Sequence, residues 1–566
     1  MFLGSISAVS TAKSNAPRPS SSLAGENQLL WTLWLTYGAF YFCRTNISAA
    51  LPGLEAGLEL SKTQIGFILG ALKIAYGLGQ FVNGQLAEKI SPRKLLAVGM
   101  LGSAVLNVVF GFGAALYFLI FVWACNGYAQ SLGWTPCMRV AANWIPFSRR
   151  GRAIGLIGTG YQVTAALTFV IAGGAVEWHG HRQAAAFTEM TEPTAANVEV
   201  AAKRQGHDLQ TARTIHGLLR VAQAKDGSEL LAVVQDKQAV APARALALET
   251  LNDLADPHRD EALRFAEATG NSFLSQAAER LRKKLNNTRP ANPAVVLKRT
   301  RQRAHRTIEV LLGRSMAFFL PAVLLAGASL VMFFFLRERP PEQDVEQADE
   351  LVAAAVQNTV WQNIRLTLTN PTLWFLAVAL GLLNACRYGF LDWGLTHLLE
   401  ETDTTLGKAG LKYAVLPIGG IAGAYWSGWI TDRWFGGRRM PVICLLLVLL
   451  GVLTLVYNYA IQAGTEISIV LLLIIGFAIY GPQVLLVGTA PIDMARQGAA
   501  AAAVGFVNFM GYLGAFAGDQ VTGWLKDRHE WHVPLMFWAG CAFAAAAAVA
   551  CLWNTRAGDA TGEEST

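Results

Sequence analysis

Two arginines inside apolar segments are the residues whose positions most demand a chemical explanation. Arg387 lies near the middle of an apolar run from about residue 373 to residue 395, and Arg44 lies in the first apolar run of the chain. Both runs are long enough to cross a bilayer, which takes roughly 20 residues. An arginine at mid-membrane costs at least about 2.5–3.5 kcal/mol on insertion scales, so it is kept where it faces a polar cavity or a counter-charge. One such arginine in the first span of each half of the chain suggests an anion clamp.

The composition is that of a protein with many membrane spans. Of its 566 residues, 53% are hydrophobic and 15% are charged, and the charges cluster between long apolar segments. The net charge of +7 does not indicate nucleic acid, because the basic residues lie in short loops and in one long polar segment. All seven cysteines fall in apolar runs and have neither metal-type spacing nor a disulfide framework. With no nucleophile, metal site or cofactor loop to be seen, we expect neither an enzyme nor a bound cofactor.

Apolar runs predict twelve membrane-spanning helices, six in each half. They cover about residues 29–51, 64–86, 95–114, 116–138, 153–176 and 316–336, and then about residues 372–395, 410–431, 441–461, 467–489, 498–519 and 533–553. A long polar stretch separates the fifth run from the sixth. The predicted fold class is therefore an all-α membrane protein, with two six-helix halves and a soluble α-helical insert between helices 5 and 6.

This pattern divides the chain into regions with a predicted side of the membrane. They are a disordered cytoplasmic tail (1–28), helices 1–5 (29–176), an extracytoplasmic insert (177–315), helix 6 (316–336), a cytoplasmic linker (337–371), helices 7–12 (372–553) and a cytoplasmic tail (554–566). Lys and Arg gather in alternate short loops, which is typical of the cytoplasmic side. We therefore expect a multi-pass protein of the cell (inner) membrane with both termini in the cytoplasm.

The insert has the sequence of a small helical domain. Alanine-rich segments at residues 241–254 and 259–285 have spaced Leu and Val, which predicts amphipathic helices, and Asp256-Pro257 and Gly270-Asn271 predict breaks. Helical pairs of this kind resemble a short HEAT-like array. Three roles stay open for it: a tolerated loop insertion, a module that docks an unknown partner, and a lid over the outward entrance. Its histidines are scattered without metal spacing.

A weak internal repeat relates the two halves. Gly84 to Lys89, with Arg93 and Lys94 after it, follows the second span. Gly428 to Arg433, with Arg438 and Arg439 after it, follows the eighth span. This arrangement resembles the loop motif of the Major Facilitator Superfamily, whose two halves are related as repeats with the substrate at the midplane between them.

Several further segments resemble one branch of that superfamily, the organophosphate:phosphate antiporters. The stretch RYGFLDW, from Arg387 to Trp393, resembles the seventh-helix signature of the branch. Other matching segments are Tyr41 to Asn46 with Pro52, Asn126-Gly127 with Gln130, Gly133 to Cys137, Trp144, Arg150-Gly151, Tyr480 to Gln483 and Gly511 to Gly514. The matches lie in both membrane halves and none lies in the insert.

The resemblance implies exchange of an organic phosphate for inorganic phosphate, and the residue chemistry agrees with it. A phosphoryl dianion has several acceptor oxygens, and the planar fork of an arginine can bind two of them and does not lose its proton. One arginine from each half would let the substrate draw the halves together. The expected substrates are thus a sugar phosphate or glycerol phosphate and inorganic phosphate, and the bilayer is the other partner.

The remaining candidate substrate-binding residues surround these arginines in the predicted helices. They are Lys73, Tyr41, Tyr76, Gln80, Tyr161, Gln162, Tyr388, Asp392 and Trp393. Lys73 and Gln80 are seven residues apart and share a helix face, with Tyr76 between them. The family places a lysine near position 80, so Lys73 either supplies that charge from a displaced position or has a structural role. Asp392 pairs with Lys73 or with an arginine during gating, or it only packs.

Two departures from the family weaken any prediction of the organic substrate. Tyr161-Gln162 stands where bacterial members have histidine and asparagine, and Thr45 replaces a basic residue found in some relatives. Both changes leave the arginine pair intact. We therefore predict a secondary active transporter that exchanges an organophosphate for phosphate by alternating access. The alternatives are a membrane receptor that senses an organophosphate and signals through the insert, and a proton-coupled carrier of another anion.

Overall fold

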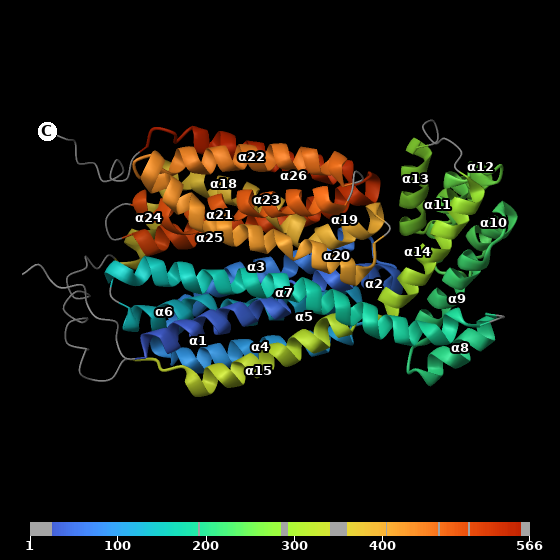
Figure 1. The fold of residues 1–566 in the computed structure, drawn as a ribbon, viewed down its shortest axis with the longest axis horizontal. Helices are drawn as coiled ribbons and strands as arrows, with labels where there is room; N and C mark the ends of the chain where they lie inside the picture. The colour runs from blue at the N-terminus through green and yellow to red at the C-terminus, as the bar shows by residue number, and fades with distance from the viewer. Residues whose placement is uncertain are drawn as a thin grey trace, which may run out of the picture.

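The computed structural model describes residues 25–145, 147–190, 193–284, 292–339, 359–402, 404–461, 465–495 and 499–555. All regular secondary structure in these ranges is helical. Figure 1 shows two groups of long helices lying side by side, one from each half of the chain, with a further group of helices at one end. Most of the predicted N-terminal tail, part of the predicted linker and most of the predicted C-terminal tail lie outside the described residues.

The N-terminal half is built from eight α-helices and a short 3-10 turn among the described residues. They are α1 (Glu26–Ala39), η1 (Phe40–Cys43), α2 (Ile47–Leu58), α3 (Lys62–Lys89), α4 (Pro92–Gly111), α5 (Leu116–Ser131), α6 (Trp134–Trp144), α7 (Phe147–Thr188) and α15 (Met316–Phe335). The first predicted span is interrupted at η1, and the fourth predicted span is divided between α5 and α6. The interruption at η1 lies immediately before Arg44.

The C-terminal half repeats this plan with two π-helical turns. Its elements are α17 (Val360–Leu368), α18 (Pro371–Tyr388), η3 (Gly389–Trp393), α19 (Gly394–Glu401), α20 (Leu406–Tyr413), α21 (Val415–Trp434), α22 (Arg439–Ala460), α23 (Thr465–Val484), η4 (Leu485–Thr489), α24 (Ala490–Asp493), α25 (Ala500–Arg528) and α26 (His532–Ala550). The turn η3 directly follows Arg387 and Tyr388. Such π-turns occur mostly as single bulges inside α-helices, frequently at functional sites.

The third group of helices comes from the segment between α7 and α15. It consists of α8 (Ala195–Arg204), α9 (Leu209–Gln223), α10 (Gly227–Gln235), α11 (Ala241–Asp253), α12 (Arg259–Ala268), α13 (Ser272–Lys284) and α14 (Pro293–Gly313). The predicted helix at residues 241–254 and the predicted breaks near Pro257 and Gly270 are confirmed, and Gly270 has a φ of 68°. These helices bury their own hydrophobic core, which includes Ile215, Leu248 and Leu274.

The junction between this group and the bundle differs from the prediction. Hydropathy predicts that the fifth span ends near residue 176, but α7 runs on to Thr188. Residues 177–188 contain Gln, Arg and several Ala and no proline, so nothing in them ends the helix. On the return, α14 ends at Gly313 and α15 begins at Met316. The insert is therefore carried by extensions of the helices of the N-terminal half.

Several helices begin where a polar side chain caps the first free backbone N–H groups. Ser91 accepts a hydrogen bond from the N–H of Lys94 and is followed by Pro92 at the first position of α4. Asn370 accepts a hydrogen bond from the N–H of Thr372 and is followed by Pro371 in the same way. A polar cap followed by proline is a strong local start signal for a helix. The first residues of α4 and α18 are thus determined by the local sequence as well as by packing.

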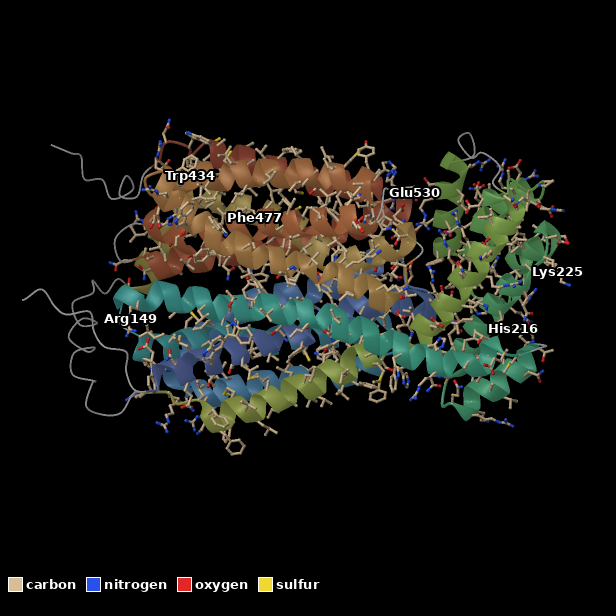
Figure 2. The ribbon with its side chains drawn as sticks, in the orientation of Figure 1. Arg149, His216, Lys225, Trp434, Phe477 and Glu530 are labelled. Carbon is tan, nitrogen blue, oxygen red and sulfur yellow. The ribbon has the colours of Figure 1, made fainter. Side chains whose placement is uncertain are left out.

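Seven helical segments in the described ranges are long and apolar enough to cross a membrane. They are Pro92–Gly111, Ala153–Thr188, Pro293–Phe335, Pro371–Glu401, Arg439–Ala460, Glu466–Asp493 and His532–Ala550. The two halves share a hydrophobic core whose members include Leu69, Phe169, Leu380 and Tyr413. In Figure 2, Arg149 lies at the end of the bundle opposite the insert, whereas Glu530 lies at the insert end.

The halves approach each other closely at the insert end. A Cβ atom added to Gly410 of α20 would overlap the backbone of Phe169 in α7, and one added to Gly523 would overlap the backbone of Lys62 in α3. At Gly155 and Gly158, nearer the opposite end of α7, a Cβ atom would meet nothing within 4 Å. The described helices are therefore in close contact across the halves beside the insert.

Candidate anion-binding site

Arg44 lies between η1 and α2 and is buried, with 5% of its surface exposed. Its Nε donates a hydrogen bond to Oε1 of Gln130 over 3.2 Å, and its Nη1 donates one to the hydroxyl of Tyr41 over 3.3 Å. The Nε2 of Gln130 in turn donates to the carbonyl of Phe40 over 2.9 Å, so Gln130 is fixed against the break in the first span. The guanidinium also stacks over the ring of Tyr76 at 4.2 Å.

Arg387 occupies the corresponding position in the C-terminal half, at the end of α18 and before η3. Only 2% of its surface is exposed. Its guanidinium carbon lies 4.7 Å from the ring centre of Tyr388 and 5.1 Å from that of Tyr480. Its Nε is buried and has no hydrogen-bond partner among the described residues. Neither Arg387 nor Arg44 forms an ion pair with a described carboxylate, so aromatic faces are their main neighbours.

A row of tyrosines connects the two arginines across the interface between the halves. Tyr41, which Arg44 covers at 4.7 Å, stacks on Tyr161 of α7 with ring centres 4.8 Å apart. Tyr161 packs on Tyr480 of α23 at 6.2 Å, and Arg387 lies over Tyr480. The predicted residues Tyr41 and Tyr161 are thus brought together with both arginines. Tyr480, which the sequence motif contained without a predicted role, completes the row.

A second polar connection crosses the interface beside Arg44. The Nε2 of Gln80 donates to the hydroxyl of Tyr76 over 2.7 Å, and the Oε1 of Gln80 accepts from Nδ2 of Asn508 over 2.9 Å. The ring of Tyr76 packs on that of Tyr512 at 4.7 Å. Tyr76 therefore contacts the arginine, and Gln80 is linked to it through Tyr76. Asn508 of α25 was not predicted, and Tyr512 lay in a matched segment without a predicted role.

Lys73 has a different environment from either arginine. Its Nζ forms ion pairs with Oδ2 of Asp392 and with Oδ2 of Asp519, and it lies 4.5 Å from the ring centre of Tyr388. Its side chain is 2% exposed, and those of Asp392 and Asp519 are 7% and 0% exposed. Pairing with Asp392 was one of the predicted possibilities. Asp519 was missed, although an acidic residue at the end of the apolar run 498–519 was a signal for it.

Two predicted residues each have a buried N–H group that makes no hydrogen bond of normal geometry within the described part of the chain. The Nε2 of Gln162 and the Nε1 of Trp393 have no hydrogen-bond partner among the described residues. Gln162 is adjacent in sequence to Tyr161 on α7, whereas the ring of Trp393 packs edge-on against Trp531 at 6.5 Å. A buried polar atom left unpaired is costly, so the free N–H groups of Gln162 and Arg387 are donors available to a ligand.

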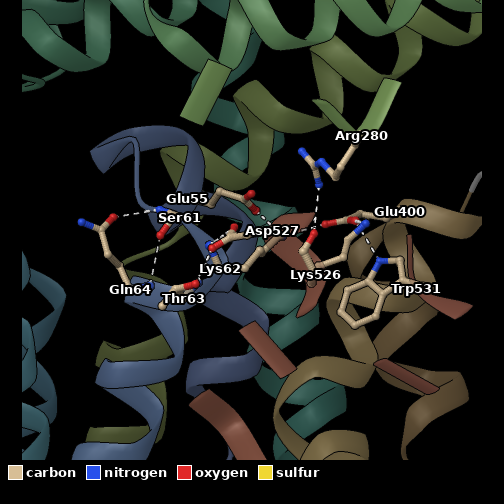
Figure 3. A network of polar contacts seen from close by, with 10 residues as sticks. All are labelled: Glu55, Ser61, Lys62, Thr63, Gln64, Arg280, Glu400, Lys526, Asp527 and Trp531. Carbon is tan, nitrogen blue, oxygen red and sulfur yellow. Dashed lines mark hydrogen bonds and ion pairs between the residues drawn. The ribbon is translucent and has the colours of Figure 1, made fainter. Parts of the chain in front are cut away.

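A network of charged residues joins the halves beside the insert (Figure 3). The Nζ of Lys62 donates to Oε1 of Glu400 over 2.7 Å and also pairs with Glu55. The carboxylate of Asp527 accepts from the N–H groups of Lys62 and Thr63, each over 2.9 Å. Asp527 thereby caps the start of α3 from the other half. This network, together with Lys73, holds α3 against the C-terminal half.

The insert takes part in the same network. The Nη1 of Arg280 in α13 donates to the carbonyl of Lys526 over 3.3 Å, and Lys526 pairs with Glu400 at 3.1 Å (Figure 3). On the N-terminal side, Gln210 of α9 donates to Glu59 over 3.0 Å. The insert therefore contacts both halves at the end where they meet.

Comparison with known proteins identifies the family of the bundle. The family model of the Major Facilitator Superfamily matches residues 33–188 and 310–518. The fold is similar to that of a bacterial homologue of the human lysosomal transporter Spinster, with a TM-score of 0.56, 12% identity, and coverage of 94% of this chain and 96% of that one. The matched ranges leave out the residues of α8 to α13 and most of α14.

Three curated relatives cover nearly the whole chain. A probable hexose phosphate transport protein of Chlamydia trachomatis is 24% identical over 93% of this chain and 91% of its own length. A glycerol-3-phosphate transporter of Bacillus subtilis is 23% identical, with coverage of 93% and 92%, and the membrane sensor protein UhpC of Escherichia coli is 23% identical, with coverage of 90% and 87%. The chain therefore belongs to the Major Facilitator Superfamily, and its relatives there are those of the organophosphate:phosphate antiporter family.

Proposed function

We propose that the protein exchanges a phosphorylated organic metabolite for inorganic phosphate across the cell membrane, with the phosphoryl group bound between Arg44 and Arg387. The observation that carries the proposal is the presence of two buried guanidinium groups, one in each half, without an ion-pair partner among the described residues. A buried charge of this kind is stabilised when an anion arrives. The curated relatives named as transporters act on hexose phosphate and glycerol-3-phosphate.

The free donors fit a tetrahedral dianion. The Nε of Arg387 is unpaired, and the Nη1 of Arg44 makes only a long hydrogen bond to a tyrosine hydroxyl. Charge-assisted hydrogen bonds from these groups to phosphoryl oxygens replace weaker contacts with aromatic faces. The tyrosine row through Tyr161 and Tyr480 gives the site hydroxyl groups and ring faces that suit an organic moiety with hydroxyls. We assign Gln162 to the same role through its unpaired amide N–H.

The arrangement of contacts supports alternating access about this site. In this conformation the two halves are joined beside the insert by Lys62, Glu400 and Asp527, so we infer that the route to the site opens at the opposite end. That end carries Arg149 and the other basic loops predicted to be cytoplasmic. The twelve-span topology, with residues 177–315 outside the cell membrane and both termini inside, is part of this proposal.

Exchange in proteoliposomes tests the proposal directly. Purified protein is reconstituted into vesicles loaded with phosphate, and uptake of labelled phosphate is measured with and without external hexose phosphates and glycerol 3-phosphate. We expect uptake that depends on internal phosphate and is inhibited by at least one ester. Vesicles loaded with a non-phosphorylated anion are the control. Uptake that ignores internal phosphate, or that follows a pH gradient alone, would contradict the exchange.

A second candidate function is an organophosphate receptor that signals through the insert. It is favoured by the contact of Arg280 with the C-terminal half, which makes the insert sensitive to movement of the halves, and one curated relative is named a membrane sensor protein. Exchange in the same vesicles, together with a binding measurement, distinguishes the two functions. A receptor binds the ester, as measured by calorimetry on the purified protein, and shows no exchange.

A further inference from the structure

The three charged groups around Lys73 do not balance. Lys73 contributes one positive charge, and Asp392 and Asp519 contribute two negative charges if both are ionised. All three side chains are at most 7% exposed, so water does not screen the excess charge. A buried net charge of −1 is costly, and the usual outcome is that one acid takes up a proton.

The contacts indicate which atom would hold that proton. Lys73 approaches Oδ2 of Asp392 and Oδ2 of Asp519. The other oxygen of Asp519, Oδ1, is buried and has no partner of normal hydrogen-bond geometry among the described residues, although the indole N–H of Trp393 interacts with this carboxyl group. An ionised carboxylate is less stable when one of its oxygens has neither water nor a hydrogen-bond donor beside it, whereas a neutral carboxylic acid can carry its proton on that oxygen.

The neighbours of Asp519 come from several elements. Lys73 lies on α3, Asp392 and Trp393 lie on η3, and the ring centre of Tyr388 in α18 lies 4.5 Å from the ammonium group. Arg387 lies against the same Tyr388 ring, and its positive charge favours the ionised form of the acids until an anion neutralises it. Lys73 is the one group among these that bonds to both carboxylates.

We propose that the Lys73–Asp392–Asp519 cluster is a proton-binding site, with the proton on Oδ1 of Asp519. The proposal adds a proton to the proposed exchange cycle. When the halves close beside the insert, Lys73 of the N-terminal half enters between the two acids of the C-terminal half, and one proton moves from water on that side to Asp519. When the halves separate there, the acids become hydrated and the proton returns to water.

Infrared spectroscopy of the reconstituted full-length protein tests the site without relying on transport. The C=O stretching band of a protonated carboxylic acid is recorded between about pH 5 and pH 9, where exposed acids are ionised. We expect one band in the wild type that is lost in Asp519→Asn. It is also lost in Asp392→Asn, because a single acid then balances Lys73 without a proton.

Asp527→Asn is the matched control, since Asp527 lies on the same helix but caps α3 through backbone N–H groups. The band should be unchanged in this variant. A wild type with no such band, or a band that survives in Asp519→Asn, would overturn the proposal.

The functional consequence is measured separately as phosphate exchange against pH. In the wild type we expect exchange to fall by up to about tenfold per pH unit once Asp519 ionises, as a one-proton step requires. In Asp519→Asn this slope should disappear. If the wild type shows the infrared band but its exchange does not depend on pH in this way, the proton site exists but takes no part in exchange, and that part of the proposal is wrong. If the protein shows no exchange at all, the proposed function is rejected, whereas the infrared test of the proton site remains valid.

Discussion

The molecule buries positive charge in two different ways within the same bundle. Arg44 and Arg387 lie against tyrosine rings and neutral polar groups and have no ion-pair partner among the described residues. Lys73 is held by two carboxylates from the opposite half. The two environments are adjacent, because Lys73 and Arg387 lie at 4.5 and 4.7 Å from the same ring, that of Tyr388.

The difference separates charge that holds the halves together from charge that is available to a ligand. An ammonium group satisfied by two carboxylates has little to offer a phosphate, and breaking its pairs would be costly. A guanidinium over aromatic faces keeps its hydrogen-bond donors and most of its charge for an incoming anion. The sequence allows Lys73 either a substrate-binding or a structural role, and its contacts favour a role at the interface between the halves.

The largest effect is expected for Lys73→Met. The change leaves Asp392 and Asp519 buried together without a counter-charge, and breaking a buried ion pair in this way costs about 3–5 kcal/mol. We expect a marked fall in thermal stability in detergent and little exchange. The triple variant Lys73→Met, Asp392→Asn, Asp519→Asn removes all three charges and should recover most of the stability. A triple variant as unstable as the single one would show that the ion pairs are not what the lysine provides.

The next effect is expected for Arg387→Lys, which keeps the charge and removes the planar fork. Losing one charge-assisted hydrogen bond to phosphate, worth about 1.5–3 kcal/mol, corresponds to a loss of roughly 10- to 150-fold in phosphate affinity and exchange. Thermal stability should change little, in contrast to Lys73→Met, because Arg387 forms no ion pair with a carboxylate of the described residues.

Arg149→Lys is the matched control for that prediction. Arg149 donates two hydrogen bonds of 2.9 Å to Glu26 at the far end of the bundle, so it loses the same fork outside the proposed site. Exchange by this variant should stay close to that of the wild type. Equal losses of exchange in Arg387→Lys and Arg149→Lys would show that the guanidinium of Arg387 does not bind the phosphoryl group.

A smaller effect is expected from a methyl group placed between the halves. Gly410→Ala puts a Cβ atom into the backbone of Phe169 across the interface, and overpacking of this kind costs typically about 1–3 kcal/mol. Since the clash exists only when the halves close beside the insert, we expect slower exchange with phosphate binding retained. Gly155→Ala, which meets nothing within 4 Å, should exchange phosphate normally. A slow Gly155→Ala variant would mean that α7 packs differently at that end during the cycle.

Much of the bundle could be predicted from the sequence because long apolar runs and capped starts are local signals. Ser91-Pro92 and Asn370-Pro371 mark the first residues of α4 and α18, close to the predicted spans. The extension of α7 to Thr188 was missed because hydropathy ends at the membrane, whereas a helix ends only where its backbone is interrupted.

The candidate site was predictable to the extent that polar residues in apolar runs stand out. Arg44, Arg387 and Lys73 are visible in this way, and the family resemblance added Tyr41 and Tyr388. The partners Asp519, Asn508 and Tyr480 were not assigned, because pairing across the two halves depends on the packing of helices distant in sequence. The sequence also gave no way to tell an arginine that lacks a carboxylate partner from a lysine that has two.

The smallest effect is expected at the contact between the insert and the C-terminal half. Arg280→Ala removes one hydrogen bond of 3.3 Å to the carbonyl of Lys526, which is worth about 0.5–1.5 kcal/mol. Because the insert is attached to the N-terminal half through α7 at one end and through α15 at the other, this bond stabilises only the state in which the halves meet beside it. We expect a change in exchange rate of about twofold to tenfold, with unchanged thermal stability. Arg282→Ala, which breaks a pair with Glu267 inside the insert, is the control. If both variants behave like the wild type, the contact does not restrain the halves, and the insert is a domain that the transport cycle tolerates.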